Sequence, residues 1–402
     1  MKKNRLLLID GNSIINRAFF ALPPMDNGQG LHTNAIYGFL TMLFKMIKSY
    51  EPSHISVAFD MKAPTFRHKS YTEYKAGRKK MPGELAMQLD PLKDVLDKLN
   101  IDREEIEGYE ADDILGTLSL DAEKEGYEVY IVTGDRDAIQ LASDNTRVLI
   151  TKKGVGEVEE YDAQAVMDRY SLTPDQFIDL KGLMGDKSDN IPGIPGIGEK
   201  TGIKLLLEYK TVQGVLDNVD KLKGAQKKKV EENMESALMS KDLATIFREV
   251  PLDYSLDQMA FGEFSVEEVV KAFQELKFTS LIARLNDLTG QEDQAADIEI
   301  CKLTDFDAFI DQVKDRGQIF MKVFRTDANI LDQDVYMTYL SLGNDKLYRV
   351  HGDDILKIRT ILEDEDIEKI GYEMKADYVA LKPYGIDLRN MAFDIAIAEY
   401  VI

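Results

Sequence analysis

Nine acidic residues in the first half of the chain have the types and spacing of a site that binds divalent cations. They form five short clusters: Asp10; Asp60; Glu110, Asp112 and Asp113; Asp135 and Asp137; and Asp186 and Asp189. Carboxylate oxygens are the ligands that Mg²⁺ and Mn²⁺ prefer. Like charges held close together also repel one another unless cations neutralise them. The clusters therefore predict a metal-dependent site, provided that the fold brings them together.

Three short apolar runs would position the acids. Residues 6–9 lead into Asp10, residues 55–59 into Asp60, and residues 129–132 into Asp135. Short apolar runs separated by helical stretches indicate buried parallel strands, whose carboxyl ends share the edge of a sheet where ligands bind. A single Asp after a strand is more often a helix N-cap. Five clusters in one register instead favour a converging metal site of the kind used by nucleases.

Composition narrows the class of protein. Zinc is not expected, because the four histidines are scattered (His32, His54, His68 and His351) and Cys301 is alone. A single cysteine also excludes an internal disulfide. Since no apolar run is long enough to span a membrane and Asp10 interrupts the first one, we expect a cytoplasmic protein. A length of 402 residues allows two or three domains.

The net charge of −22 is unevenly distributed. Residues 291–402 contain 24 acidic and 13 basic residues, a net charge of −11. Residues 61–81 are basic instead, with Tyr71 and Tyr74 among Lys62, Arg67, Lys69, Lys75, Arg78, Lys79 and Lys80. Such a segment is either a solvated helix face or a nucleic-acid contact, in which cations neutralise phosphates and aromatic rings stack on bases. Its position directly after Asp60 favours substrate binding.

A second basic region has the pattern of a phosphate-binding hairpin. Thr173 and Pro174 predict the start of a helix, residues 191–201 a compact turn, and the following residues a second helix through Tyr209. Glycines allow the backbone to approach an anion, and the start of the second helix offers free N–H groups. We expect a helix-hairpin-helix that binds DNA through Gly193, Gly196, Gly198, Lys200 and Thr201. For Lys227, Lys228 and Lys229 a solvated helix face is favoured over direct contact.

These strings together resemble the 5′-nuclease, flap endonuclease-like domain at the N-terminus of bacterial DNA polymerase I. The resemblance covers about residues 1–290 and is carried, in order, by Leu8-Ile-Asp10-Gly-Asn-Ser13, Arg17-Ala-Phe19, Ala58-Phe-Asp60, Gly108-Tyr-Glu-Ala-Asp-Asp113, Thr133-Gly-Asp-Arg-Asp137 and Gly185–Thr201. It implies an α/β fold with a PIN-like 5′-nuclease domain. That domain would have a central, mostly parallel sheet, a helical arch and a helix-hairpin-helix subdomain.

The resemblance also implies roles for single residues. Two Mg²⁺ or Mn²⁺ ions would be held, the first by Asp10, Asp60, Glu110, Asp112 and Asp113, and the second by Asp135, Asp137, Asp186 and Asp189. Lys75 and Arg78 would stabilise the reacting phosphate from one face of the arch helix. Tyr74 and Arg17 would contact the substrate, a DNA with a 5′ flap, nick or single-strand/duplex junction. The expected reaction is hydrolysis of a phosphodiester by a monomer.

The last quarter of the chain resembles the start of the 3′–5′ exonuclease-like domain of the same polymerases, a partial RNase H-like α/β domain. The match runs through Ile370–Asp377, Tyr384–Arg389 and Ala392–Asp394. Such an exonuclease needs an Asp-x-Glu pair on its first strand, and residues 318–325 have neither acid. We expect no proofreading, and a chain that is the N-terminal part of a longer polymerase.

The expected organisation is a catalytic domain at 1–172, a helical DNA-binding subdomain at 173–290 and the exonuclease-like domain at 291–402, with a polar linker near residues 289–296. Two other functions remain open. A module that recognises flaps or nicks without cutting would need the hairpin and the basic segment, but not the complete set of acids. An RNase of PIN-like architecture would share the acids but generally lacks a segment such as residues 186–201.

Overall fold

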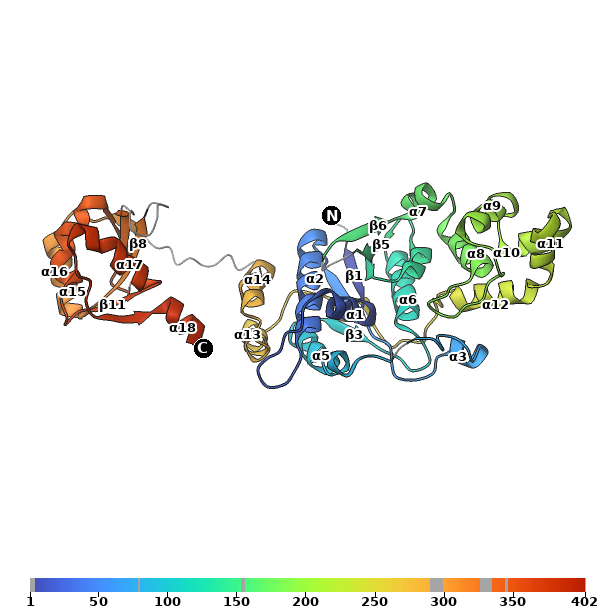
Figure 1. Cartoon of the computed structure of the whole chain (residues 1–402), viewed down its shortest axis with the longest axis horizontal. Coiled ribbons are helices and arrows are strands. Elements are labelled where there is room, and N and C mark those ends of the chain that lie inside the picture. Colours follow the sequence, from blue (N-terminus) through green and yellow to red (C-terminus); the bar gives the residue numbers. More distant parts are fainter. Residues whose placement is uncertain are drawn as a thin grey trace. The chain divides into compact units, whose positions relative to one another are not determined.

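The computed structural model describes residues 4–78, 80–152, 156–289, 299–325, 335–343 and 346–401. Two compact units divide the chain, Met1–Gly290 and Gln291–Ile402. Figure 1 shows the helices and strands of both units. In the described ranges, no helix is both long and apolar enough to cross a membrane. The polar linker expected near residues 289–296 falls almost entirely outside the described residues.

A six-stranded sheet with the order β3-β2-β1-β4-β5-β6 forms the centre of the first unit. Its strands are β1 (Arg5–Asp10), β2 (His54–Ala58), β3 (Asp102–Glu104), β4 (Glu128–Thr133), β5 (Thr146–Thr151) and β6 (Val158–Tyr161). All neighbours are parallel except β5 and β6. The three apolar runs of the sequence are β1, β2 and β4, so the prediction of buried parallel strands is confirmed.

Helices cover both faces of this sheet, because alternate side chains of each strand point to opposite sides (Figure 1). Leu7 and Ile9 pack with α1 (Gly11–Ala21), α2 (Asn34–Tyr50), α5 (Leu89–Lys98), α13 (Val266–Glu275) and α14 (Thr279–Thr289). Leu6 and Leu8 pack on the other face with α6 (Ala111–Lys124). Both faces of the strands are therefore buried, which explains their continuous apolar sequences.

A helical region continues the second of these cores. It contains α7 (Ala163–Tyr170), α8 (Pro174–Met184), α9 (Glu199–Tyr209), α10 (Val212–Asp217), α11 (Gly224–Glu231) and α12 (Met234–Ala244). Thr173 caps α8 by accepting the Gln176 N–H at 3.3 Å, and the Gln176 side chain accepts the Thr173 N–H at 3.1 Å. This capping box confirms the predicted start of the first hairpin helix. The second helix ends at Tyr209, also as predicted.

Short elements complete the first unit: α3 (Phe66–Ser70), α4 (Gly83–Ala86), and the 3₁₀ helices η1 (Arg136–Leu141), η2 (Val219–Lys221) and η3 (Leu256–Met259). The prediction that one helical face presents Lys75 and Arg78 is wrong, because α3 ends at Ser70 and turns follow. Lys75 has a φ of 56°, and its N–H donates to the Asp189 carbonyl at 2.9 Å rather than to a carbonyl one helical turn earlier. This long-range hydrogen bond replaces helical continuation.

The second unit has its own six-stranded sheet, in the order β12-β11-β8-β9-β10-β7. The strands are β7 (Glu299–Lys302), β8 (Gln318–Arg325), β9 (Val335–Ser341), β10 (Lys346–His351), β11 (Glu368–Gly371) and β12 (Met391–Asp394). The helices are α15 (Phe306–Arg316), α16 (Arg359–Leu362), α17 (Met374–Leu381), α18 (Ile395–Val401), η4 (Gly352–Ile358) and η5 (Lys382–Tyr384). The strand expected to lack the acid pair is β8.

Candidate active site

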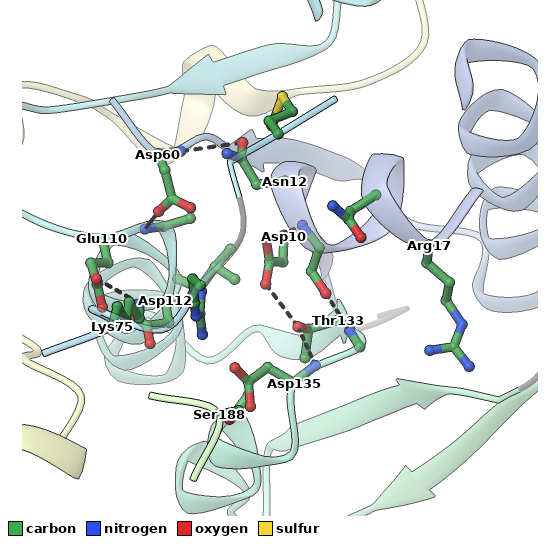
Figure 2. A pocket seen from close by; sticks show the side chains of 18 of the residues that line it. Asp10, Asn12, Arg17, Asp60, Lys75, Glu110, Asp112, Thr133, Asp135 and Ser188 are labelled. Carbon is green, nitrogen blue, oxygen red and sulfur yellow. Dashed lines mark hydrogen bonds and ion pairs between the residues drawn. The ribbon is translucent and has the colours of Figure 1, made fainter. Parts of the chain in front are cut away.

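A cavity of about 600 Å³ opens at the carboxyl ends of β1, β2 and β4. Figure 2 shows acidic side chains from four separate segments pointing into it. Five of the nine predicted acids line it: Asp10, Asp60, Glu110, Asp112 and Asp135. The topology explains their convergence, since parallel strands deliver the residues that follow them to one edge.

Local capping interactions fix two of these acids. Asp10 is the last residue of β1 and the N-cap of α1, where it accepts the Ser13 N–H at 2.9 Å and the Thr133 hydroxyl at 2.8 Å. Asp60 accepts the Ala111 N–H at 2.7 Å, which ties the end of β2 to the start of α6. The N-cap and the cation-site interpretations of Asp10 are thus compatible, because the cap uses only part of the carboxylate.

The cavity acids carry negative charge that the protein balances incompletely. Burial, and then the charge of Asp60, raise the pKa of Asp10 to about 7. Burial also raises the pKa of Asp60, and it raises the pKa of Asp112 well above its ordinary value, with the charge of Asp113 adding to the effect. Oδ1 of Asp112 is buried with no hydrogen-bond partner. These carboxylates favour either protonation or a bound cation.

Asp113 does not reach the cavity. It is fully buried and forms a two-pronged ion pair with Arg67, with Nη1–Oδ2 and Nη2–Oδ1 distances of 2.8 and 2.7 Å. It also accepts the Glu110 and Phe247 N–H groups. The structure thus places Asp113 in a structural pair beside the site, and it buries Arg67, which was expected within an exposed basic segment.

Two cations of the segment after α3, Lys75 and Arg78, form ion pairs with acids of the site. The Lys75 ammonium lies 2.7 Å from Oε1 of Glu110, and the Arg78 guanidinium pairs with Asp189. Although burial opposes ionisation of Glu110, the positive charge of Lys75 helps to hold its pKa below the ordinary value. The Tyr74 hydroxyl donates to Glu110 at 3.0 Å, and its ring is buried rather than free to stack on a base.

Two of the four acids assigned to the second metal lie around a lysine that the sequence did not single out. Lys181 of α8 pairs with Asp137 and, at 2.5 Å, with Asp186. Burial and the charge of Asp135 raise the pKa of Asp137 to about 7. Burial acts the same way on Asp186, but hydrogen bonds from Lys181 and Ser188 hold its pKa at about 2. Across the described residues, no three His, Cys, Asp or Glu side chains are arranged to hold a metal ion.

Arg17 also borders the cavity, beyond Asp135 in Figure 2. Its guanidinium donates to the Lys152 carbonyl, and its buried Nε has no partner. Sequence analysis missed other cavity-lining residues that donate or accept hydrogen bonds: Asn12, Ser13, Asn16, Thr133 and Ser188. Their closeness in sequence to Asp10, Asp135 and Asp186 was the available signal.

The hairpin residues lie together between α8 and α9. The Gly193 N–H donates to Ser240 at 2.9 Å and the Ile194 N–H to the Leu183 carbonyl at 2.8 Å, which fixes the turn to α12 and α8. Gly193 has a φ of 58°, and an added Cβ would collide with the Gly185 backbone. Gly198 is the N-cap of α9, and Lys200 and Thr201 lie in its first turn. The predicted turn is therefore built, and Gly193 is required sterically, whereas an added Cβ at Gly198 would meet nothing.

Lys229 differs from its two neighbours on α11. Lys227 pairs with Asp220 at 2.6 Å, and Lys228 with Glu232 at 3.6 Å. The Lys229 ammonium instead lies against Gly196 of the hairpin, and no described carboxylate pairs with it. One lysine of the run thus adds charge to the hairpin surface.

Three family models match separate parts of the chain, the first two of them adjoining. Residues 5–171 match "5′-3′ exonuclease, N-terminal resolvase-like domain", and residues 172–267 match "5′-3′ exonuclease, C-terminal SAM fold". Residues 329–402 match "DNA polymerase I, ribonuclease H-like domain". DNA polymerase I of Bacillus subtilis is 40% identical over 408 residues, and that of Bacillus caldotenax is 42% identical over 410 residues. This chain belongs to the DNA polymerase I family. Residues 5–267 are its 5′–3′ exonuclease region, as the resemblance implied.

The two Bacillus polymerases align with the whole chain, but the chain spans only 46% of each of them. Solved structures agree on the fold. A T5 5′-exonuclease with bound zinc ions has a TM-score of 0.51 at 22% identity. The match covers 71% of this chain and 100% of the exonuclease chain. The catalytic core of Rad2 with a DNA substrate has a TM-score of 0.50 at 15% identity and covers 72% of this chain and 92% of its own. The predicted fold class is confirmed.

Proposed function

We propose that the first unit is a metal-dependent 5′–3′ exonuclease and flap endonuclease that hydrolyses DNA phosphodiester bonds in replication and repair. Removal of Okazaki primers and nick translation are the expected settings. The observation that carries this proposal is the cavity at the sheet edge, where acids from separate segments meet with incompletely balanced charge. Family membership agrees with it, and the T5 and Rad2 structures share the fold.

The chemistry of the acids fits divalent cations, although no three described His, Cys, Asp or Glu side chains are arranged to hold an ion, so the carboxylates would have to move together to share one. The acids that line the cavity offer oxygen ligands, and the buried, unpartnered Oδ1 of Asp112 has an unused acceptor site. We propose that Asp10, Asp60, Glu110 and Asp112 hold one Mg²⁺ or Mn²⁺, and that Asp135, Asp137, Asp186 and Asp189 hold a second. Bound divalent cations would polarise the scissile phosphate and lower the pKa of an attacking water.

The chain's own residues position and screen the substrate. Lys75 and Arg78 are the cations nearest the acids on the cavity wall, so they are placed to turn from Glu110 and Asp189 towards the phosphate oxygens. Arg17 extends the basic rim on the opposite side. Asp113 and Arg67 position Glu110 from behind, through its N–H and its carboxylate respectively.

The hairpin supplies a second contact with DNA. Gly196 and Gly198 are exposed and lack side chains, so the backbone there can approach a phosphate, and the start of α9 presents N–H groups beside Lys200 and Thr201. We propose that this surface binds duplex phosphates while the cavity binds the strand to be cut. Lys229 adds a second cation there, beside Lys200.

A labelled 5′-flap DNA incubated with the purified chain in Mg²⁺, in Mn²⁺ and in EDTA tests the proposal. We expect cleavage near the junction, stopped by EDTA and restored by added metal. A blunt duplex without a 5′ overhang or nick serves as the control substrate. Binding of the flap without cutting at any Mg²⁺ or Mn²⁺ concentration would contradict the proposal.

That contradicting outcome corresponds to a second candidate, a module that recognises flaps or nicks without cutting. The ion pairs of Lys75, Arg78 and Lys181 with site acids favour it, since they balance some of the charge internally. The unpartnered Asp112 oxygen and the raised pKa of Asp10 favour the nuclease, because a pure binding module would have no use for them.

For the whole protein we propose a DNA-directed DNA polymerase that acts as a monomer in the bacterial cytoplasm, at the nucleoid. We further propose that the second unit has no proofreading activity. The strand β8, on which such an exonuclease would carry its acid pair, has no acid, and its Lys322 pairs with Asp377 at 3.1 Å. We also propose three domains: a catalytic domain at 1–172, a helical DNA-binding subdomain at 173–290 and an exonuclease-like domain at 291–402.

A further inference from the structure

Lys181 is a buried cation between two acids that come from different segments. Its side chain is 11% exposed, and those of Asp137 and Asp186 are 14% and 17% exposed. Asp137 belongs to η1, whereas Lys181 and Asp186 come from the end of α8 and the turn after it. The ammonium therefore joins the catalytic sheet to the hairpin region through one pair of carboxylates.

The two acid sets of the site differ in how their charge is balanced. Asp112, in the first set, has a buried oxygen with no partner. Asp137 and Asp186, in the second set, share one ammonium, and Asp186 also accepts the Ser188 N–H at 2.7 Å and its hydroxyl at 2.5 Å. The first set therefore keeps one oxygen without a partner, although its Glu110 pairs with Lys75. In the second set, Asp137 and Asp186 are both already paired with Lys181.

We infer that the Lys181 ammonium is the resident counter-ion of Asp137 and Asp186, and that a divalent cation binds these two acids only in competition with it. This inference rests on the proposed function and adds an order of metal binding to it. The first set loads at lower metal concentration than the second. Lys181 is thus a residue that sets the affinity of the second position.

Another ion pair on the same helix provides a matched control. Lys241 of α12 lies 2.8 Å from Oδ1 of Asp179 on α8, and Asp179 is buried. Asp179 otherwise accepts the Val212 N–H and lies outside the nine-acid set. Removing either lysine leaves buried carboxylate charge next to α8, but only the loss of Lys181 leaves two carboxylates that a metal ion can share.

The experiment compares Lys181→Met with Lys241→Met in the full 402-residue chain, by thermal unfolding with and without Mg²⁺ and by Mn²⁺ titration followed by electron paramagnetic resonance. Both variants should unfold at lower temperature than the parent chain without metal. Mg²⁺ should raise the unfolding temperature of Lys181→Met towards that of the parent chain, but it should not raise that of Lys241→Met. The weaker class of Mn²⁺ sites should bind about tenfold more tightly in Lys181→Met, because the competing ammonium is gone; groups beside metal ligands commonly change affinity by this much.

Equal Mg²⁺ rescue of the two variants, or unchanged Mn²⁺ affinity in Lys181→Met, would overturn the inference. Should Lys181→Met not fold, the parent chain decides. It must show two Mn²⁺ classes, the tighter one lost in Asp112→Asn and the weaker one in Asp186→Asn, and a single class would overturn the inference. Flap cleavage is measured in parallel. A chain that binds Mn²⁺ in two classes without cutting would refute the proposed nuclease but not the role of Lys181.

Discussion

Asp112 in the first unit and Asp377 in the second occupy equivalent local positions, each in the first turn of a helix beside a central sheet. Asp377 is fully buried, and it accepts a hydrogen bond from Lys322 at 3.1 Å and from the Val323 N–H at 3.2 Å. Asp112 keeps one buried oxygen without any partner. A buried carboxylate alone is therefore a poor sign of function. What distinguishes the two is whether the protein supplies the compensating charge.

The largest effect should come from Asp112→Asn. We expect flap cleavage to fall on the order of 10²–10³-fold or more, because a charge aimed at the reacting centre is lost, while thermal stability stays equal or rises as an unpaired buried charge disappears. Steady-state cleavage rates and thermal melts check this. Asp144→Asn, at an exposed loop residue, should change neither quantity. Full activity of Asp112→Asn would show that Asp112 takes no part in cleavage.

Breaking the Lys322–Asp377 pair of the second unit should have the opposite result, with stability lost and cleavage kept. Lys322→Met leaves Asp377 buried without its cation, so the free energy of unfolding of the second unit should fall by about 3 kcal/mol. Flap cleavage should be unchanged. Hydrogen exchange of β8 amides against β1 amides in the full chain measures the loss locally. The double variant Lys322→Met/Asp377→Leu should recover much of it, and Mg²⁺ should recover none. Rescue by Mg²⁺ would mean that Asp377 still holds a metal.

A smaller effect is expected on how the stability of the first unit depends on pH. In the folded chain the pKa of Asp10 is about 7, against an ordinary value of 3.8. The folded state thus binds more protons than the unfolded state between those values, and Asp10 contributes a stability that is lost as pH rises. Without metal, Asp10 should account for a loss of about 1.4 kcal/mol between pH 6 and pH 8, and Asp137, whose pKa is also about 7, should add to it. Urea unfolding at a series of pH values checks this. Mg²⁺ and the Asp10→Asn variant should each flatten the dependence, and a steeper dependence in Asp10→Asn would contradict it.

The smallest effect concerns the hairpin. Lys229→Ala should weaken binding of a nicked duplex about threefold and lower the slope of log affinity against log salt by about one, because one phosphate contact is lost. Lys228→Ala, one residue away and paired with Glu232, should leave the slope unchanged. Fluorescence anisotropy in Ca²⁺ across a salt series measures both. Identical slopes for the two variants would show that Lys229 makes no phosphate contact.

Sequence reasoning reached the sheet and the gathering of Asp10, Asp60 and Asp135, because buried parallel strands have an unmistakable apolar pattern and their ends must meet. The pairing of Arg67 with Asp113 could not be foreseen. Arg67 lies among exposed cations in the sequence, and only tertiary contacts with Leu243 and Thr245 show that it is buried.

Lys181 was missed for a related reason. It lies in the helix predicted to begin the hairpin, and nothing local shows that its ammonium reaches Asp137, more than forty residues earlier in the chain. The helical face expected for Lys75 and Arg78 failed because spacing of three residues is compatible with a turn as well as a helix. The backbone contact of Lys75 with Asp189, which decides between them, is long-range.

Arg67 has a further consequence for how the first unit measures its substrate. Its guanidinium binds Asp113 beside the cavity and also the carbonyls of Leu243 and Thr245, at the end of α12, to which the hairpin is fixed through Ser240. Arg67 thereby links the surface proposed to bind the duplex to the acids proposed to act on the strand. In such a nuclease the distance between the duplex contact and the cleavage site is fixed. The cut should fall at a constant number of nucleotides from the duplex contact, whatever the length of the flap.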